Sequence, residues 1–218
     1  FVYEFVAYPA GTHIYYGHAN TNEPMNKGLY GPLIILPKQA GSDLPEEWAK
    51  INRDVVLMLD EWNSAFFKGE EAKSAMAGQQ TSKRMAGYNF TINGNVFTDE
   101  RPTMLSVKRG ERIRVRLINM GELSHTMYLP GHSLLITHID GYSAPAPQRL
   151  DTVSITPGQR IDLVFEANQE GRWIWQCHTA SHAMSDDGHR RGMLLMVAYP
   201  DGLDLAKFPL SKPTKLSE

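Results

Sequence analysis

A strict alternation of apolar and charged side chains between residues 112 and 117 constrains the fold of this chain most strongly. Six successive residues follow it: Arg112, Ile113, Arg114, Val115, Arg116 and Leu117. A period of two residues places the apolar side chains on one face of a β-strand and the arginines on the other. We expect the apolar face to pack into a core and the arginine face to lie in solvent.

Other short stretches rich in β-branched and aromatic residues recur along the chain, separated by turn-forming residues. They cover residues 2–6, 13–16, 29–37, 55–62, 88–97, 134–139, 151–156, 160–166, 172–176 and 193–198. The dipeptide Asn93-Gly94 is typical of a two-residue hairpin turn between two strands. No long amphipathic helical pattern accompanies these stretches. Short strands at this spacing predict an all-β protein built as a β-sandwich.

The chain divides at a polar stretch. Residues 39–54 predict a linker with one helical turn, and residues 1–38 contain too few strands to bury both faces of a sandwich. This first segment therefore has to pair with residues outside the chain or dock on the later part of it. Residues 55–200 contain enough strands for a complete domain, with a partly helical surface loop at 63–86, and residues 201–218 predict a C-terminal tail.

Bulk properties exclude several classes of function. The formal net charge is −2, so no basic surface indicates a nucleic-acid partner. No apolar run approaches the roughly 20 residues that a membrane-spanning helix needs. No signal peptide is visible, and residues 1–6 read as a strand already under way. We expect the N-terminus to be processed, truncated or incompletely represented.

The chain has a single cysteine, Cys177, in the segment QCHTASH at residues 176–182. One cysteine excludes an internal disulfide. Histidines lie on its C-terminal side, and another histidine-centred segment lies upstream. A thiolate with two imidazoles and a weak thioether is the ligand set of a blue-copper electron-transfer site. The alternative is a buried free cysteine that only packs.

Four motifs resemble those of the multicopper oxidase family, in the family's order. They read PAGTHIYYGH at residues 9–18, GLYGPLII at 28–35, LDTVSITPGQRIDL at 150–163 and GRWIWQCH at 171–178. The resemblance covers nearly the whole chain, is weakest across residues 63–86, and is nearest to two-domain laccase-like members. It implies cupredoxin-like Greek-key β-sandwiches: the C-terminal portion of a first cupredoxin domain at residues 1–38, and a complete second one with a type 1 copper site at 55–200.

The resemblance also implies a ligand set. Cys177 and His182 match two type 1 copper ligands of the late motif, and His125, which opens the segment HTMYLPGH, matches the third. Met193 is the expected weak axial ligand and Met184 its rival, although most methionines pack in cores. One type 1 copper per chain is expected. The alternative for His125 is a core or turn histidine with ordinary hydrogen bonds.

The family's oxidases also carry a three-copper cluster held by eight imidazoles in His-x-His pairs, and this chain covers three of the four pairs. At four of these six positions another residue replaces the imidazole: Tyr16, Tyr128, Pro130 and Gln176. Imidazoles remain at two positions, His18 and His178. Phenol and amide groups are poor copper ligands beside imidazole, and proline offers none. A full cluster that reduces dioxygen is therefore not expected. His18 and His178 form a residual second metal site or are structural.

The remaining histidines are less informative. His132, at the end of the segment HTMYLPGH, is expected to be structural or to lie near the edge of the copper site. His13, His138 and His189 are expected at the surface or in the outer surroundings of the metal.

Three functions are compatible with these residues, and the first is the leading hypothesis. It is a copper-binding redox protein that transfers one electron through a type 1 copper, working with a redox partner protein or a small reductant. The second is a laccase-like copper oxidoreductase with a reduced second metal site at a subunit interface. The third is a metal-free structural cupredoxin domain. The resemblance implies a homotrimer or part of a larger polypeptide or complex, in the periplasm or outside the cell.

Overall fold

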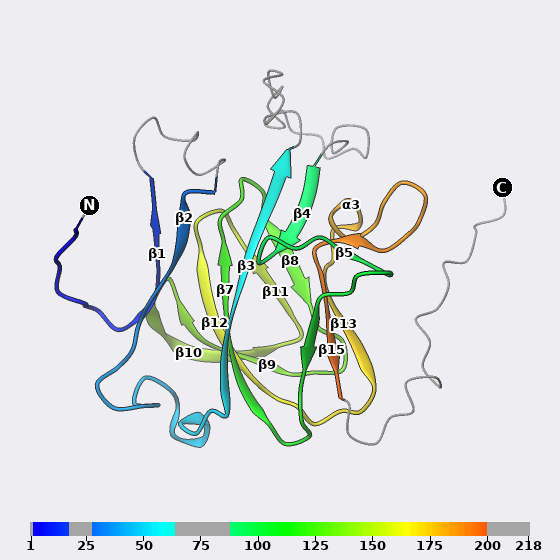
Figure 1. The fold of residues 1–218 in the computed structure, drawn as a ribbon. Helices are drawn as coiled ribbons and strands as arrows, with labels where there is room; N and C mark the ends of the chain where they lie inside the picture. The colour runs from blue at the N-terminus through cyan, green and yellow to red at the C-terminus, as the bar shows by residue number, and fades with distance from the viewer. Residues whose placement is uncertain (1, 18–27, 64–87, 200–218) are drawn as a thin grey trace.

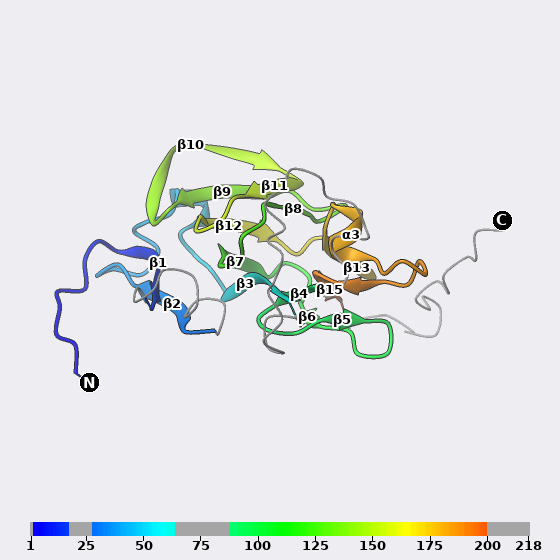
Figure 2. The same cartoon turned by 90° about the horizontal axis from the view of Figure 1, so that it is seen from above.

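Two β-sheets packed face to face form the body of the protein (Figures 1 and 2). The computed structural model describes residues 2–17, 28–63 and 88–199. The six-stranded sheet has the order β10 (Tyr142–Leu150), β9 (Leu134–Ile139), β12 (Arg160–Glu166), β7 (Arg112–Asn119), β3 (Arg53–Asn63), β4 (Tyr88–Ile92). The five-stranded sheet has the order β11 (Thr152–Ile155), β8 (His125–Tyr128), β13 (Arg172–Cys177), β15 (Leu194–Ala198), β6 (Met104–Ser106). The predicted all-β sandwich is confirmed.

The core lies between the two sheets and includes the apolar face of β7. Ile113, Val115 and Leu117 are fully buried, as the alternation predicted. They belong to one cluster with Trp175 of β13 and Leu195 of β15, from the opposite sheet. Burying an aliphatic side chain of this size contributes about 1.5–3 kcal/mol relative to leaving it exposed. Strands from both sheets are therefore fixed by one core.

The opposite face of β7 is also buried, so the prediction of a solvated arginine face is wrong. Arg114 and Arg116 share the carboxylate of Asp162 on β12, with N–O distances of 2.7 and 3.1 Å. Asp43 also pairs with Arg114 at 2.7 Å, and Asp54 with Arg116 at 2.6 Å. Buried charges are tolerated when they are paired and hydrogen-bonded. Alternation revealed which residues share a face, but not that another segment covers it.

Two segments cover this face: residues 39–54, which include Asp43, and the N-terminal hairpin of β1 (Gly11–Tyr16) and β2 (Tyr30–Ile35), which lies beside β12 (Figure 2). The Thr12 hydroxyl donates to Asp162 at 2.6 Å and accepts from Arg116 at 2.7 Å. The first segment thus docks on the six-stranded sheet. Residues 2–6, however, form no strand, contrary to the prediction. Within the described residues no neighbouring strand pairs with them, and Val2 and Phe5 are exposed.

Other expectations were met in part. The linker contains its helical turn as the 3₁₀ helix η1 (Glu46–Trp48). Asn93-Gly94 does form a turn, but β5 (Phe97–Thr98) then pairs with β14 (Arg191–Gly192) and not with β4. Of the loop expected at 63–86, only residue 63 lies within the described residues. The tail expected at 201–218 lies outside them.

The edge strand β10 was not predicted, because it contains Pro145 and Pro147. Proline lacks the N–H that a ladder needs and is tolerated only at the edge of a sheet or at a bulge. β10 meets both conditions, since it is the outermost strand and its pairing with β9 is irregular between Ser143 and Gln148.

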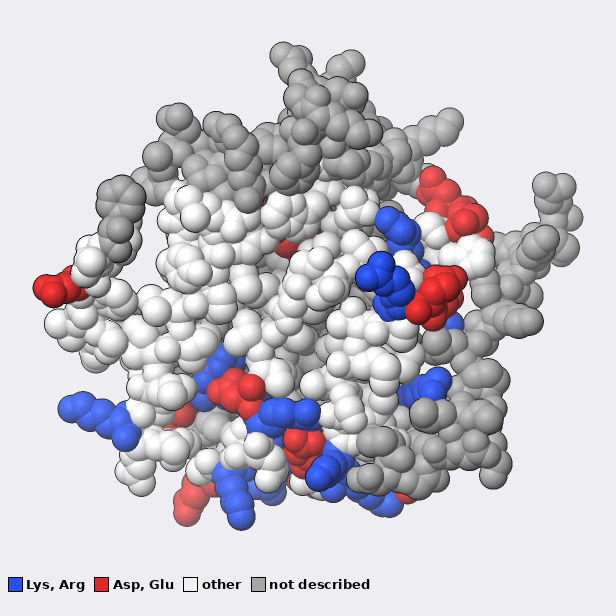
Figure 3. Space-filling model, in the orientation of Figure 1, with Lys and Arg blue, Asp and Glu red and all other residues white. Residues whose placement is uncertain are grey.

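Charged side chains on the face shown in Figure 3 are mixed in sign. Lysine and arginine atoms lie next to aspartate and glutamate atoms along the lower part of this face. This part of the surface therefore offers no basic stripe of the kind that binds a phosphate backbone. In the described part of the chain, no helix has the length and hydropathy required to cross a bilayer.

Replacing Asp162 with alanine is expected to lower the free energy of unfolding by about 3–5 kcal/mol, because two buried guanidinium groups lose their shared carboxylate. Urea unfolding measures the change. Glu170→Ala is the matched control: it breaks the exposed pair with Arg109 and should cost less than about 1 kcal/mol. Equally small losses in both variants would contradict a stabilising role for the buried network.

Candidate metal centre

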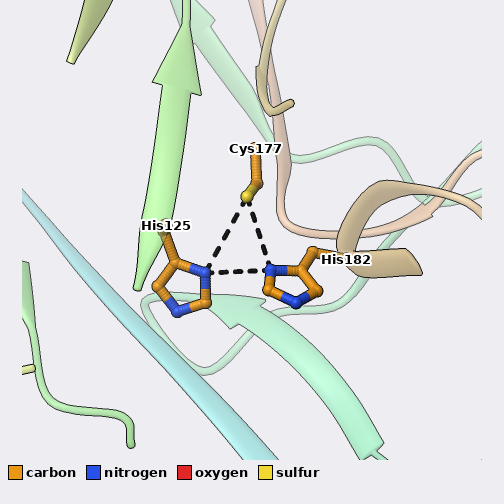
Figure 4. Close-up of side chains that lie close together, drawn as sticks. All are labelled: His125, Cys177 and His182. Carbon is orange, nitrogen blue, oxygen red and sulfur yellow. Dashed lines mark hydrogen bonds between the residues drawn. The ribbon is translucent and has the colours of Figure 1, made fainter. Parts of the chain in front are cut away.

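Three side chains named by the sequence motifs meet at one end of the sandwich (Figure 4). Cys177 Sγ lies 3.8 Å from His125 Nδ1 and 3.5 Å from His182 Nδ1, and the two Nδ1 atoms are 3.2 Å apart. All three residues are buried. Among the described residues, no other group of three His, Cys, Asp or Glu side chains converges in this way.

Local structure explains how His182 reaches Cys177. Cys177 ends β13, and the one-turn helix α3 (Ala180–Ala183) folds the chain back at once. The backbone N–H of Cys177 donates to Met193 O at 3.0 Å, and that of Met193 donates to His182 O at 2.8 Å. Gly192 has φ of 117°, and a Cβ there would overlap the His182 carbonyl oxygen. Only glycine allows this close approach.

Aromatic packing fixes the His182 ring. Phe90 of β4 stacks on it, with ring centroids 4.1 Å apart and an interplanar angle of 17°. The ring of His125 meets that of His182 edge-on, at 5.1 Å and 69°. Two elements far apart in sequence thus hold the ring between them.

Sequence reasoning missed Glu61 of β3, whose side chain is only 2% exposed. His125 Nε2 lies 3.2 Å from Glu61 Oε2, and the backbone N–H groups of Glu122 and Leu123 donate to Glu61 Oε1. A signal was available, because position 61 follows Leu57 and Leu59 on the core-facing side of the strand. A charged residue in an apolar register indicates a buried partner.

The electrostatics of the site favour a thiolate. Burial raises the pKa of the Cys177 thiol, but hydrogen bonds from His125 and His182 and from the backbone of Thr179 outweigh it and lower the pKa to about 5. Burial lowers the pKa of His125, but Cys177 and Glu61 raise it to about 9. The two shifts favour a thiolate on Cys177 and a protonated imidazole on His125 when no metal is bound.

The three atoms fit one metal ion. For Zn²⁺ as a reference, metal–nitrogen bonds of about 2.0–2.1 Å and metal–sulfur bonds of about 2.3 Å, set about 105–120° apart, separate neighbouring ligand atoms by roughly 3.2–3.8 Å. The observed sides of 3.2, 3.5 and 3.8 Å fall in that range. The thiolate and two ring nitrogens can therefore hold a metal without rearrangement.

The two candidate axial methionines differ in position. Met193 is fully buried in the same core cluster as Cys177, and its backbone bonds to both ligand segments. Met184 follows α3 and is 47% exposed. Burial and location favour Met193.

Some, but not all, of the described residues expected near a second metal site come together. His178 is exposed beside Cys177 and packs edge-on against Tyr128, with ring centroids 5.3 Å apart. Both belong to the five-stranded sheet or its end, whereas Tyr16 lies in the hairpin that docks on the six-stranded sheet. Pro130 and Gln176 accompany Tyr128 and His178 in the same layer, and His18 lies outside the described residues.

Three of the remaining histidines are partly or fully buried. The ring of His132 contacts Pro130 O and the Tyr199 hydroxyl. These hydrogen bonds agree with the first of its two expected roles, that of a structural histidine. His138 is buried beside Arg114, contrary to a surface position. His13 is half-buried with its ring near Pro9 O, and His189 is exposed, as expected.

Comparison with known proteins identifies relatives for this fold and site. Residues 53–195 match the family described as multicopper oxidase. Laccase-1 and Laccase-3 of Thanatephorus cucumeris are 31% and 32% identical over 75% of this chain. The chain spans less than a third of either laccase, 28% and 29% of their lengths.

A solved structure extends the likeness to nearly the whole chain. The blue copper oxidase from Nitrosomonas europaea is 30% identical, superposes with a TM-score of 0.75, and is matched over 97% of this chain and 64% of its own. This likeness agrees with the cupredoxin-like β-sandwich expected from the motifs. By its sequence match over residues 53–195, the chain belongs to the multicopper oxidase family.

Proposed function

We propose that this chain binds one copper ion as a type 1 centre and works in one-electron transfer. The triangle of Cys177, His125 and His182 carries the proposal, because its dimensions suit a single ion and its thiol is poised as a thiolate. When bound, copper supplies a one-electron couple at this position. A soft thiolate, two imidazoles and a weak thioether are the ligand types that such centres use.

Each residue of the site would have a separate role in holding the metal. Cys177 provides the thiolate, and the two imidazoles offer Nδ1 because both rings are held by neighbouring groups. Met193 would be the axial thioether. The buried position excludes water, which favours electron transfer over reactions of bound solvent.

A laccase-like oxidoreductase is the second candidate, favoured by the exposed His178 directly beside Cys177. Among the described residues, Tyr16 belongs to the hairpin sheet while Tyr128 and His178 belong to the five-stranded sheet or its end, so we propose that residues from another chain complete a second metal site. We therefore place this candidate at a subunit interface, in a homotrimer or as part of a longer polypeptide. A metal-free structural domain is the third candidate.

The wider setting is also proposed. Residues 1–38 would complete a first cupredoxin domain with partners outside this chain, since Val2, Tyr3 and Val6 are exposed apolar side chains. The electron donor would be a redox protein or a small reductant. A periplasmic or extracellular location follows from the family alone.

One equivalent of Cu(II) is expected to give an intense absorption band towards the red end of the visible spectrum, because thiolate sulfur bonds the metal covalently. Cys177→Ser should abolish the band. His178→Ala is the matched control and should keep it, because His178 is a neighbour outside the triangle. A colourless protein with a full equivalent of copper would contradict the proposal.

The same copper analysis tests the second candidate. Two or more coppers per chain, with turnover lost in His178→Ala, would support it.

Exchange of the methionines separates the two axial candidates. Met193→Leu is expected to raise the reduction potential and shift the visible spectrum, because a thioether is replaced by a side chain without a donor atom. Met184→Leu should leave both unchanged, since that side chain is largely exposed. A shift in Met184→Leu alone would reverse the assignment.

Metal affinity should depend on pH in a defined way. At pH 7 the Cys177 thiol, with a pKa of about 5, is deprotonated, whereas His125, with a pKa of about 9, keeps its proton. Because a metal must displace that proton, apparent affinity for Zn²⁺ should rise about tenfold per pH unit between about pH 7.5 and 8.5 and level off above about pH 9.5. Chelator competition measures it; a flat profile between those pH values would mean that His125 is already neutral.

A further inference from the structure

Two backbone N–H groups and a ring nitrogen of His125 converge on the carboxylate of Glu61. Its Oε2 is 3.2 Å from His125 Nε2, and its Oε1 accepts from the backbone N–H groups of Glu122 and Leu123. The side chain is 2% exposed, so water does not share these bonds. Both oxygens are therefore needed as acceptors at the same time.

A glutamine at position 61 could not accept hydrogen bonds at both positions. Glutamine has one acceptor oxygen and one NH₂ group. The two backbone N–H groups would both donate to the amide oxygen, so that the NH₂ group would face His125 Nε2. Two donors cannot bond each other, so His125 would have to give up its Nε2 proton and keep one on Nδ1.

The tautomer matters because Nδ1 is the atom that faces Cys177 and His182. An imidazole binds a metal through the nitrogen that carries no proton, and the hydrogen bond at the other nitrogen decides which one that is. Glu61 holds the proton at Nε2 and so frees Nδ1.

Glu61 also positions the backbone that leads into β8. Its bonds to Glu122 and Leu123 fix the turn directly before His125, and Asn119 adds a second anchor through Leu123 O at 2.7 Å. The carboxylate thus fixes both the ring and the peptide from which the ring extends.

We propose that Glu61 is the positioning residue of the metal centre: it accepts the Nε2 proton of His125 and thereby directs Nδ1 to the metal. This inference rests on the proposed metal site, but not on copper or on electron transfer. It assigns to β3 a part in the site that the ligand motifs do not contain.

The wild-type protein provides the first test. Proton–nitrogen NMR of the metal-free and Zn²⁺-loaded protein should show a slowly exchanging His125 Nε2–H in both. A His125 ring protonated at Nδ1 alone in the metal-free protein, or the absence of an Nε2 proton in the Zn²⁺-loaded protein, would overturn the inference.

Glu61→Gln provides the second test. It should remove the Nε2–H signal and weaken Zn²⁺ binding ten- to hundredfold, the range typical for loss of an outer partner of a ligating histidine. Asp60→Asn is the matched control: it neutralises the adjacent carboxylate, which bonds the Tyr30 hydroxyl and not His125. It should keep the Nε2–H signal and change affinity less than threefold.

Gly121→Ala tests the same contact without altering Glu61, because a Cβ at residue 121 would overlap the Glu61 carboxylate. It should weaken Zn²⁺ binding in the same direction, and it serves as the test if Glu61→Gln does not fold. Unchanged affinity and an unchanged Nε2–H signal in these variants would refute the role of Glu61 even if the copper band is present. Conversely, a Zn²⁺-binding wild type without a blue copper form would refute the proposed function and leave this inference standing.

Discussion

Charge cannot stay unpaired in the interior of a protein, and this constraint acts on both faces of the six-stranded sheet. On the outer face, Asp162 pairs with two buried arginines, together with Asp43 and Asp54, and also accepts a hydrogen bond from the N-terminal hairpin. On the inner face, Glu61 meets His125. β3 serves both sides, because the neighbouring Asp60 accepts a hydrogen bond from the Tyr30 hydroxyl of the hairpin. One strand therefore connects the docking of the first segment with the candidate metal centre.

The sequence revealed the periodic and the local features of this molecule. The apolar face of β7 and the pairing of Cys177 with His182 follow from a period of two and from motif spacing. The environment of a polar face does not, because it depends on which segment covers it. Arg114 and Arg116 looked solvated for that reason. Glu61 was detectable as a charge in an apolar register, but its partner lies in another strand.

The fold also changes how the incomplete family pattern is understood. Sequence motifs alone place Tyr16, Tyr128 and His178 at related positions of one cluster. In the structure Tyr128 and His178 pack against each other, but Tyr16 belongs to the separate hairpin that docks on the six-stranded sheet. Loss of imidazoles and separation in space point the same way. The proposed one-electron role at Cys177 does not depend on these residues, whereas a second metal site would need ligands beyond those that meet in the described residues.

The geometry of the triangle bears on function more directly than the identity of its ligands. The three ligand atoms already stand at metal-bonding separations in the absence of a metal. Phe90 stacks on His182, Glu61 anchors His125, and backbone bonds from Met193 secure the ligand loop. These contacts would limit the movement of the three ligand side chains when a metal binds. Ligands held by packing and hydrogen bonds form a preorganised site, and this preorganisation supports the proposed one-electron role.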